Sequence, residues 1–360
     1  MKRIALLLVG LLCIHASMVM AQADIEVINI ENPVLRPYMA DSTYFRPGGE
    51  NRTVVAKYTG ATKYKRDNEI PRGKVVTWQT NSLPEDIEQI VITVSQREDY
   101  RDSVTFSPRT TKATSYTIYN SLPGHTYYYK AEEWMKDGRV NHLADGAFRT
   151  EGRIRMINVA GAHNVRDIGG WPSTLGGTLR YGRLYRSGNL DKVTPQGIHD
   201  FVTNLGVTAE LDLRGEAKRT SSPLGEDVAY TRIVAGSYLY ALRDHADLIA
   251  ADVMWIVERL REGRNVDWHC AIGCDRCGTL SMVVEGVLGV CETDLGRDYE
   301  ISRLAGHERF RNQAGFTNML KWMKKQGPAD DLAQCFYDYL VANGVPAADL
   351  DYLREVMIVR

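Results

Sequence analysis

A cysteine and an arginine six positions apart are the residues of this chain best suited to chemistry. Cys270 follows a short β-like run over 265–268, and Arg276 stands where an apolar helical pattern begins. The apolar residues of that pattern recur with the helical period, at positions 280, 283, 284, 287 and 288. The sequence therefore predicts a strand, a tight loop over 270–276 and then a helix.

The predicted loop combines an anion site with a nucleophile. Amides at a helix N-terminus lack intrahelical partners, and they and the helix dipole favour negative charge. The same field lowers the pKa of a cysteine, so we expect Cys270 to be a thiolate. Arg276 offers a planar fork that matches two phosphate oxygens. The expected phosphate-binding residues are Ala271, Ile272, Gly273, Cys274, Asp275 and Arg276.

This loop resembles the H-C-x5-R signature of cysteine-dependent phosphatases, and above all the bacterial tyrosine and dual-specificity branch, whose loop reads H-C-x-x-G-K-D-R-T-G. Residues 164–170, 183–187, 211–214 and 298–302 resemble its N-x-R-D-x-G-G, R-S, D-L-R and D-Y-x-x-S motifs, in that order. The likeness covers roughly residues 155–330. It implies an α/β phosphatase domain, with a mainly parallel central sheet flanked by helices, that needs no metal and no cofactor.

Three residues depart from the expected pattern. Cys274 replaces the family's lysine, and Cys277 replaces a threonine whose hydroxyl normally stabilises the departing thiolate. A thiol is a weaker donor, so we expect slow breakdown of a phospho-enzyme. Asp267 stands where the strand is usually apolar, and a buried carboxylate there needs a partner.

The resemblance also implies roles. Cys270 attacks phosphorus and water hydrolyses the phosphocysteine, while His269, Cys277 and Arg214 support the loop. A carboxylic acid must protonate the leaving oxygen. Asp275 is the first candidate because related loops carry an aspartate there, and Asp212 at a predicted strand end is the second. The third candidates are Asp244 and Asp247, in a segment over 236–248 predicted to be a mobile loop.

The loop cysteines allow other interpretations. Cys270, Cys274 and Cys277 have C-x3-C-x2-C spacing, which occurs in [4Fe–4S] proteins, although predicted export argues against a cluster. A buried structural cysteine is a second alternative. Because a low-pKa thiolate oxidises readily, a reversible bond from Cys270 to either neighbour is a further hypothesis.

Residues 1–23 read as a secretory signal with a basic start, an apolar core over 4–14 and a small-residue cleavage site at 21–23. The apolar run is too short to span a membrane. Its removal would leave 42 basic and 45 acidic residues, a charge of about −3. Such a balance indicates neither nucleic acid nor a membrane surface as a partner. We expect a periplasmic or secreted protein.

The remaining chain divides into two predicted domains. Residues 24–150 favour an N-terminal all-β sandwich domain, with strands at 75–80, 90–94 and 115–119. Tyr127 after Leu122 resembles the tyrosine corner of fibronectin type III domains. Such a domain would offer a protein or glycan contact. Residues 151–360 are predicted to form the phosphatase domain, with a helical C-terminal cap from 315 onward.

The expected function is hydrolysis of phosphate monoesters, in a phosphorylated protein or a small phosphate ester. Protein phosphotyrosine is favoured because the loop lysine that would help bind a multiply charged substrate is missing at Cys274. An inositol-phosphate or phosphoinositide phosphatase is the alternative. A non-catalytic phosphate-binding module is the alternative from another class.

Overall fold

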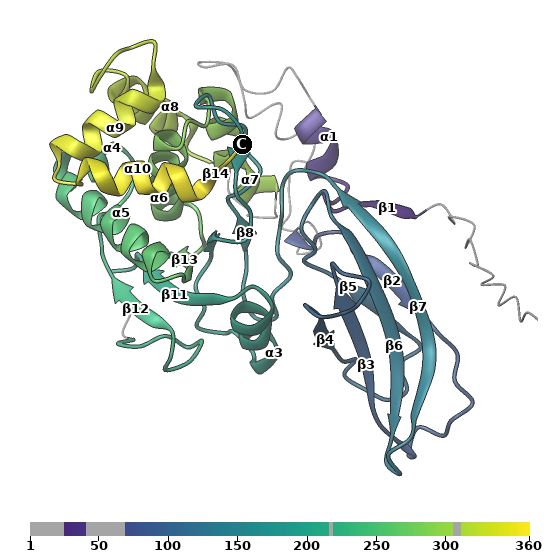
Figure 1. The fold of residues 1–360 in the computed structure, drawn as a ribbon. Coiled ribbons are helices and arrows are strands. Elements are labelled where there is room, and N and C mark those ends of the chain that lie inside the picture. Colours follow the sequence, from purple (N-terminus) through teal and green to yellow (C-terminus); the bar gives the residue numbers. More distant parts are fainter. Residues whose placement is uncertain (1–24, 41–68, 216–218, 305–310) are drawn as a thin grey trace, which may run out of the picture.

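The computed structural model describes residues 25–40, 69–215, 219–304 and 311–360, and the predicted signal segment lies outside them. These residues form a β-rich body and a larger α/β body that lie side by side (Figure 1). None of the described helices is long and apolar enough to cross a membrane.

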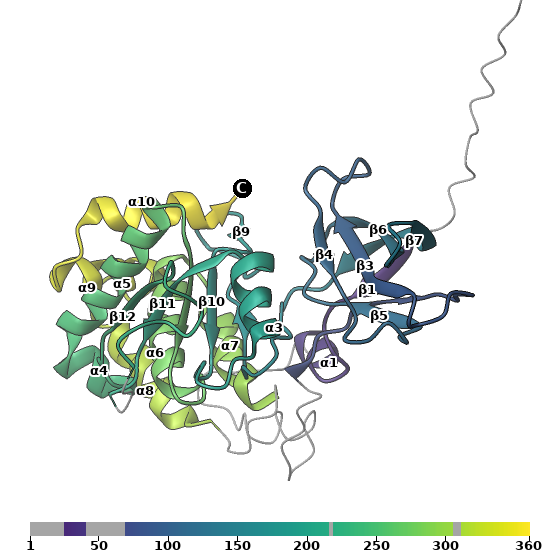
Figure 2. The same cartoon turned by 90° about the horizontal axis from the view of Figure 1, so that it is seen from below.

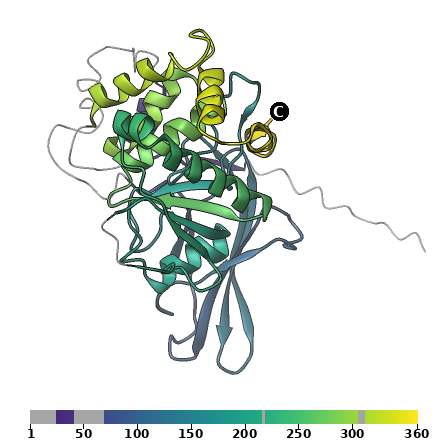
Figure 3. The same ribbon diagram turned by 90° about the vertical axis from the view of Figure 1, so that its left-hand side faces the viewer.

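The β-rich body consists of two sheets that share an apolar core. Its elements are β1 (Glu26–Asn29), β2 (Lys74–Thr77), β3 (Ile87–Ser95), β4 (Val104–Phe106), β5 (Ser115–Ile118), β6 (Thr126–Met135) and β7 (Val140–Glu151). Helix α1 (Leu35–Ala40) follows β1 along the chain, but its buried Leu35 and Tyr38 belong to the apolar core of the α/β body. One sheet has the order β1-β7-β6-β3-β4, and the other pairs β2 with β5. Along β6 every second side chain is buried, as expected for a strand with one face in a core. The long β6–β7 hairpin projects away from the helices (Figure 3).

The predicted strands at 75–80, 90–94 and 115–119 correspond to β2, to part of β3 and to β5. The contact expected of a tyrosine corner is present, since the Leu122 amide donates to Tyr127 Oη at 2.8 Å. Likeness to a fibronectin type III domain stays a prediction.

The α/β body is built on a mixed five-stranded sheet of order β12-β11-β13-β10-β8. Its strands are β8 (Arg166–Asp167), β10 (Leu184–Ser187), β11 (Val207–Asp212), β12 (Ala229–Arg232) and β13 (Asn265–His269). Four of these run parallel, and only β8 is antiparallel to its neighbour β10. A separate short pair joins β9 (Thr178–Leu179) to β14 (Ile358–Val359), which the sequence did not predict.

Helices surround this sheet (Figure 2). They are α3 (Pro195–His199), a π-helical turn η2 (Asp200–Asn204), α4 (Tyr238–Asp244), α5 (Ala246–Arg261), α6 (Asp275–Val287), α7 (Glu292–Leu304), α8 (Gln313–Met323), α9 (Leu332–Ala342) and α10 (Ala347–Met357). The predicted breaks near 327 and 344 separate α8, α9 and α10. The expected mobile loop over 236–248 is wrong, because α4 and the start of α5 occupy most of it.

The central strand β13 determines where the site lies. It is buried along four of its five residues, and α6 follows it after a short loop. Because β10, β11 and β13 are parallel, their carboxyl ends meet at one edge of the sheet. The register places both Ser187 and Asp212 beside His269 at that edge.

Polar contacts join the two bodies. The Asn158 amide donates to Asn120 Oδ1 at 2.7 Å, and the Asn120 side-chain amide donates back to the Asn158 carbonyl at 3.0 Å. Glu31 Oε1 accepts from the amides of Arg153 and Ile154. These contacts fix the connection that leads from β7 into the α/β body.

Candidate active site

Cys270 lies directly after β13 and begins a tight loop that ends at the first residue of α6. Its side chain is buried. Gly273 has a φ of +70°, and a Cβ there would stand 2.6 Å from the Ser187 carbonyl oxygen. Only glycine fits this close approach in the left-handed region. The loop therefore curls against the end of β10.

Side chains from outside the loop hold four successive carbonyl oxygens of it. Asn189 donates to the Ala271 carbonyl at 2.7 Å, and Asn164 donates to the carbonyls of Ile272 and Gly273, both at 3.1 Å. Arg186 also donates to the Gly273 carbonyl at 3.0 Å. Arg311 donates to the Cys274 carbonyl at 2.9 Å. A trans peptide places its C=O and N–H on opposite sides. The amides of residues 272–275 therefore face away from these donors and converge on the inner side of the loop. Converging amides at a helix start form an anion cradle.

A fully buried charge cluster supports this arrangement. Asp298 accepts from Arg166 at 3.0 Å and from Arg186 at 2.7 Å, and Arg166 also holds Asn164 at 2.9 Å. Although burial opposes it, the two guanidinium charges lower the pKa of Asp298. Burial raises the pKa of the nearby Glu285 well above its usual range, which favours its neutral form. Two arginines then face one carboxylate, so the cluster is net positive behind the cradle.

Cys270 and Cys277 form a donor–acceptor pair of sulfurs. The hydrogen bond from the Cys277 thiol is the main cause that lowers the pKa of Cys270 well below its ordinary value. The amides of Cys277 and Ile272 and the charge of Arg276 act in the same direction, while burial opposes them. Burial, together with the bond to Cys270, raises the pKa of Cys277. One sulfur is thus held as a thiolate and the other as a thiol donor.

The side chains of Arg276 and Cys274 are also held in place by the protein. Arg276 Nη1 donates to the Leu213 carbonyl at 3.2 Å, which ties the guanidinium to the end of β11. Cys274 is buried, and burial raises the pKa of its thiol. Its sulfur lies 3.8 Å from the side-chain amide of Asn164. The carbonyls of Ser187 and Trp268, at 3.6 and 3.8 Å, are alternative acceptors for the Cys277 thiol when it is not bonded to Cys270. The sulfurs of Cys274 and Cys277 thus have separate protein partners, which favours a phosphate loop over an iron–sulfur site.

The partner that the sequence could not name for Asp267 is Ser187. The Ser187 hydroxyl donates to Asp267 Oδ2 at 2.7 Å across the β10–β13 pair. The other oxygen, Oδ1, is buried and accepts no hydrogen bond from the described residues. Burial raises the pKa of Asp267 to about 7. This carboxyl is therefore poised to titrate near neutral pH inside the sheet.

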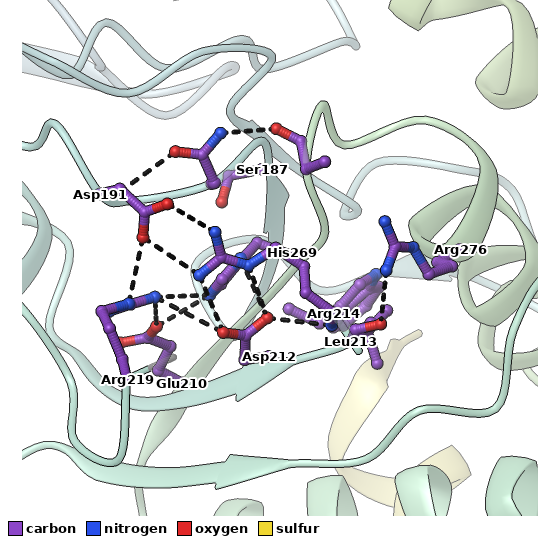
Figure 4. Close-up of polar contacts among 12 residues, drawn as sticks. Ser187, Asp191, Glu210, Asp212, Leu213, Arg214, Arg219, His269 and Arg276 are labelled. Atoms are coloured by element: carbon purple, nitrogen blue, oxygen red, sulfur yellow. Dashed lines mark hydrogen bonds and ion pairs between the residues drawn. The ribbon is translucent and has the colours of Figure 1, made fainter. Parts of the chain in front are cut away.

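His269 lies within a network of carboxylates and arginines at the ends of β11 and β13 (Figure 4). Its Nε2 is 2.8 Å from Glu210 Oε1, which also accepts from Arg219 at 2.9 Å. Although burial opposes it, the bond to Glu210 raises the pKa of His269. The ring is thereby held in place directly before Cys270.

Asp212, the second candidate acid, is buried and bound by an arginine. It is fully buried and accepts from Arg214 Nε and Nη2, both at 2.9 Å. Although burial opposes it, the bonds from Arg214 lower the pKa of Asp212. Arg214 in turn binds Asp191 at 2.6 Å, on the same face (Figure 4). Arg214 therefore stabilises this network rather than touching the loop in the contacts described.

Asp275 lies on the cradle itself. Its side chain is 47% exposed, and Oδ1 accepts from Tyr238 Oη at 2.5 Å and from Arg311 Nη1 at 2.7 Å. Asp244 stands at the far end of α4 and pairs with its neighbour Arg243. Asp275 is thus the candidate carboxyl that the structure keeps beside the loop and open to solvent.

Several residues of this site were not identified from the sequence. Asn189, Tyr238 and Arg311 carry no local signal, because their partners are brought to them only by the tertiary fold. Asn164, Arg166 and Arg186 lie in the motifs of the family, yet their roles as loop supports follow only from the tertiary fold.

A metal is not suited to the one cluster of potential ligands in the described chain. Glu210, Asp212 and His269 offer atoms within 4.8 Å of one another. Arg219 and Arg214 already bind the two carboxylates. Guanidinium groups at those oxygens compete with a cation, so we assign no metal there.

The chain belongs to the tyrosine phosphatase family, whose model matches residues 157–355. No curated protein matches it. The solved structure of TpbA from P. aeruginosa is similar at 15% identity, over 46% of this chain and 96% of TpbA, with a TM-score of 0.32. So weak a structural likeness carries no argument, and the site rests on its own geometry.

The titration of Asp267 generates a stability prediction. Its folded pKa of about 7 exceeds the ordinary 3.8, so its stabilising contribution is present at low pH and is lost as pH rises through 7. When the pH rises from 5 to 8, the wild type should lose this contribution and Asp267→Asn should not. The free energy of unfolding of Asp267→Asn should therefore rise by roughly 2–3 kcal/mol relative to that of the wild type. Urea unfolding at both pH values measures this, with the exposed Asp227→Asn as control. An unchanged difference between the two pH values would show that Asp267 is not a buried titrating acid.

Proposed function

We propose that this protein is an exported phosphatase that hydrolyses phosphate monoesters, with protein phosphotyrosine as the favoured substrate, through a phosphocysteine intermediate. One observation carries the proposal. Side chains outside the loop hold the carbonyls of residues 271–274 outward, so the amides converge on a space beside Cys270, whose pKa is lowered. Export is inferred from the sequence of residues 1–23 alone.

In the first step the Cys270 thiolate attacks phosphorus, the S–P bond forms and the P–O bond to the leaving group breaks. The amides of the cradle and the Arg276 guanidinium stabilise the charge on the equatorial oxygens. Asp275 supplies the proton to the leaving oxygen. In the second step water attacks phosphorus, its proton passes to Asp275, and the thiolate leaves with stabilisation by the Cys277 thiol.

Two features of the loop favour an aryl monophosphate. Ile272 is 45% exposed and offers an apolar surface beside the cradle. At the family's lysine position, Cys274 is buried and adds no positive charge for further phosphates. An inositol-phosphate substrate is the alternative, distinguished by comparing phosphotyrosine peptides with inositol phosphates at equal concentration. For the β-rich body we propose a fibronectin type III-like fold, supported by the Tyr127 corner contact, and with it a contact to protein or glycan.

Loss of the nucleophile should abolish turnover but spare binding. We expect mature protein to hydrolyse an aryl phosphate in the presence of chelator, and Cys270→Ser to lose that activity while still binding vanadate or phosphate. Cys291→Ser, which changes a half-buried cysteine outside the loop, should keep full activity. Steady-state rates measure turnover, and calorimetric titration measures the binding of vanadate or phosphate. Vanadate binding without turnover in the wild type would instead identify a phosphate-binding module, and dependence on added metal would also contradict the mechanism.

The thiol of Cys277 should limit the second step. A hydroxyl donates more strongly to a departing thiolate than a thiol does. We therefore expect Cys277→Thr to speed phospho-enzyme breakdown several-fold, which burst kinetics with 4-nitrophenyl phosphate resolves. Cys277→Ala, which has no donor, should slow it. Equal breakdown rates in all three proteins would mean that the thiol does not assist the leaving sulfur.

A further inference from the structure

A tyrosine from outside the loop holds the side chain of Asp275. Tyr238 begins α4, and its hydroxyl donates to Asp275 Oδ1 at 2.5 Å. Its backbone amide donates to Thr279 Oγ1 at 2.8 Å, and that hydroxyl donates to the Asp275 carbonyl at 2.9 Å. Both the main chain and the side chain of Tyr238 are thus tied to the first turn of α6.

The backbone of Tyr238 adopts a conformation that aromatic residues rarely take. Its φ is +60°, in the left-handed region, where a bulky side chain is strained. Such strain persists only where surrounding contacts enforce it, and it concentrates at functional sites. Here the contacts to Thr279 and Asp275 enforce it, and they also aim the phenol at the carboxylate.

Arg311 holds the same oxygen from the other side. Nη1 lies 2.7 Å from Asp275 Oδ1, and Nη2 donates to the Cys274 carbonyl at 2.9 Å. The third nitrogen, Nε, donates to the Tyr299 carbonyl at 3.2 Å, and the guanidinium lies 4.1 Å from the centre of that ring. Arg311 is buried, so the fork is rigid and joins Asp275 to the cradle.

The phenol network completes this support. Tyr238 Oη lies 2.9 Å from Tyr299 Oη, which donates to the Asn312 carbonyl at 3.0 Å. Burial raises the pKa of Tyr238, so its hydroxyl stays a donor across the working pH range. Two fixed donors therefore meet on one oxygen of a carboxyl that remains half exposed.

We propose that Tyr238 is a positioning residue for proton transfer, which fixes the Asp275 carboxyl toward the leaving oxygen while Arg311 anchors it to the cradle. This inference rests on the proposed function. The proton that reaches the leaving oxygen comes from the Asp275 carboxyl, and the attacking water returns a proton to it. Tyr238 keeps its own proton and acts only on the orientation of the carboxyl.

Leaving-group dependence tests this role. A phenolate that leaves poorly needs the proton, whereas 4-nitrophenolate leaves with little help. We expect Tyr238→Phe to lower kcat/KM for phenyl phosphate, which reports the first step, about tenfold or more, and kcat/KM for 4-nitrophenyl phosphate less than about threefold. Tyr240→Phe, on the exposed face of the same helix, is the matched control and should change neither. If Tyr238→Phe does not fold, Thr279→Val removes the acceptor of the Tyr238 amide and should give the same selective loss.

A double-mutant cycle separates positioning from general damage. If Tyr238 acts through Asp275, the protein with Asp275→Asn and Tyr238→Phe should be no slower on phenyl phosphate than Asp275→Asn alone. Equal losses on both esters, or additive losses in the cycle, would overturn the inference and leave the phosphatase proposal standing. No turnover of either ester by the unmodified protein would overturn both.

Discussion

The site depends on the hydrogen bonds that hold the carbonyls of residues 271–274 toward the outside of the loop. Amides converge on an anion only if the carbonyls of the same peptides turn the other way. Inside a protein those carbonyls need donors, because an unpaired buried C=O costs about as much as a lost hydrogen bond. Asn164, Arg186, Asn189 and Arg311 provide them from three separate segments of the chain. The motifs that contain Asn164, Arg186 and Asp298 thus form one scaffold behind the loop.

Charge balance explains the other buried groups. Two buried arginines would be costly without Asp298, which accepts from both. The cluster nevertheless keeps an excess of positive charge behind the cradle, where an anion on the inner side benefits from it. The pKa values of Cys270 and Cys277 shift in opposite directions. The Cys277 thiol, the loop amides and Arg276 lower that of Cys270, whereas burial and the bond to Cys270 raise that of Cys277. A thiol at position 277 can therefore replace the expected hydroxyl as a donor without itself ionising.

The sequence was most informative where chemistry depends on local spacing. The strand, loop and helix around Cys270 follow from short-range patterns, and the structure has them as β13, the cradle and α6. The sequence was least informative where a side chain binds a partner that only the tertiary fold brings near it. Asp212 looked like an available acid at a strand end, but Arg214 two residues later turns back and binds it. The helix at 238–244 was missed because its start is a strained tyrosine held by distant partners. Ser187 became the partner of Asp267 only through the register of β10 and β13, which no single strand specifies.

The ionisation of Cys270 is the most direct test of this account. The rate of its alkylation by iodoacetamide can be followed against pH, with peptide mapping to separate it from the other thiols. The structure predicts a midpoint well below that of an ordinary cysteine thiol, and an upward shift when Cys277→Ala removes the thiol donor. A midpoint near the ordinary value of about 8.5 in the wild type, unchanged in the variant, would contradict the central claim.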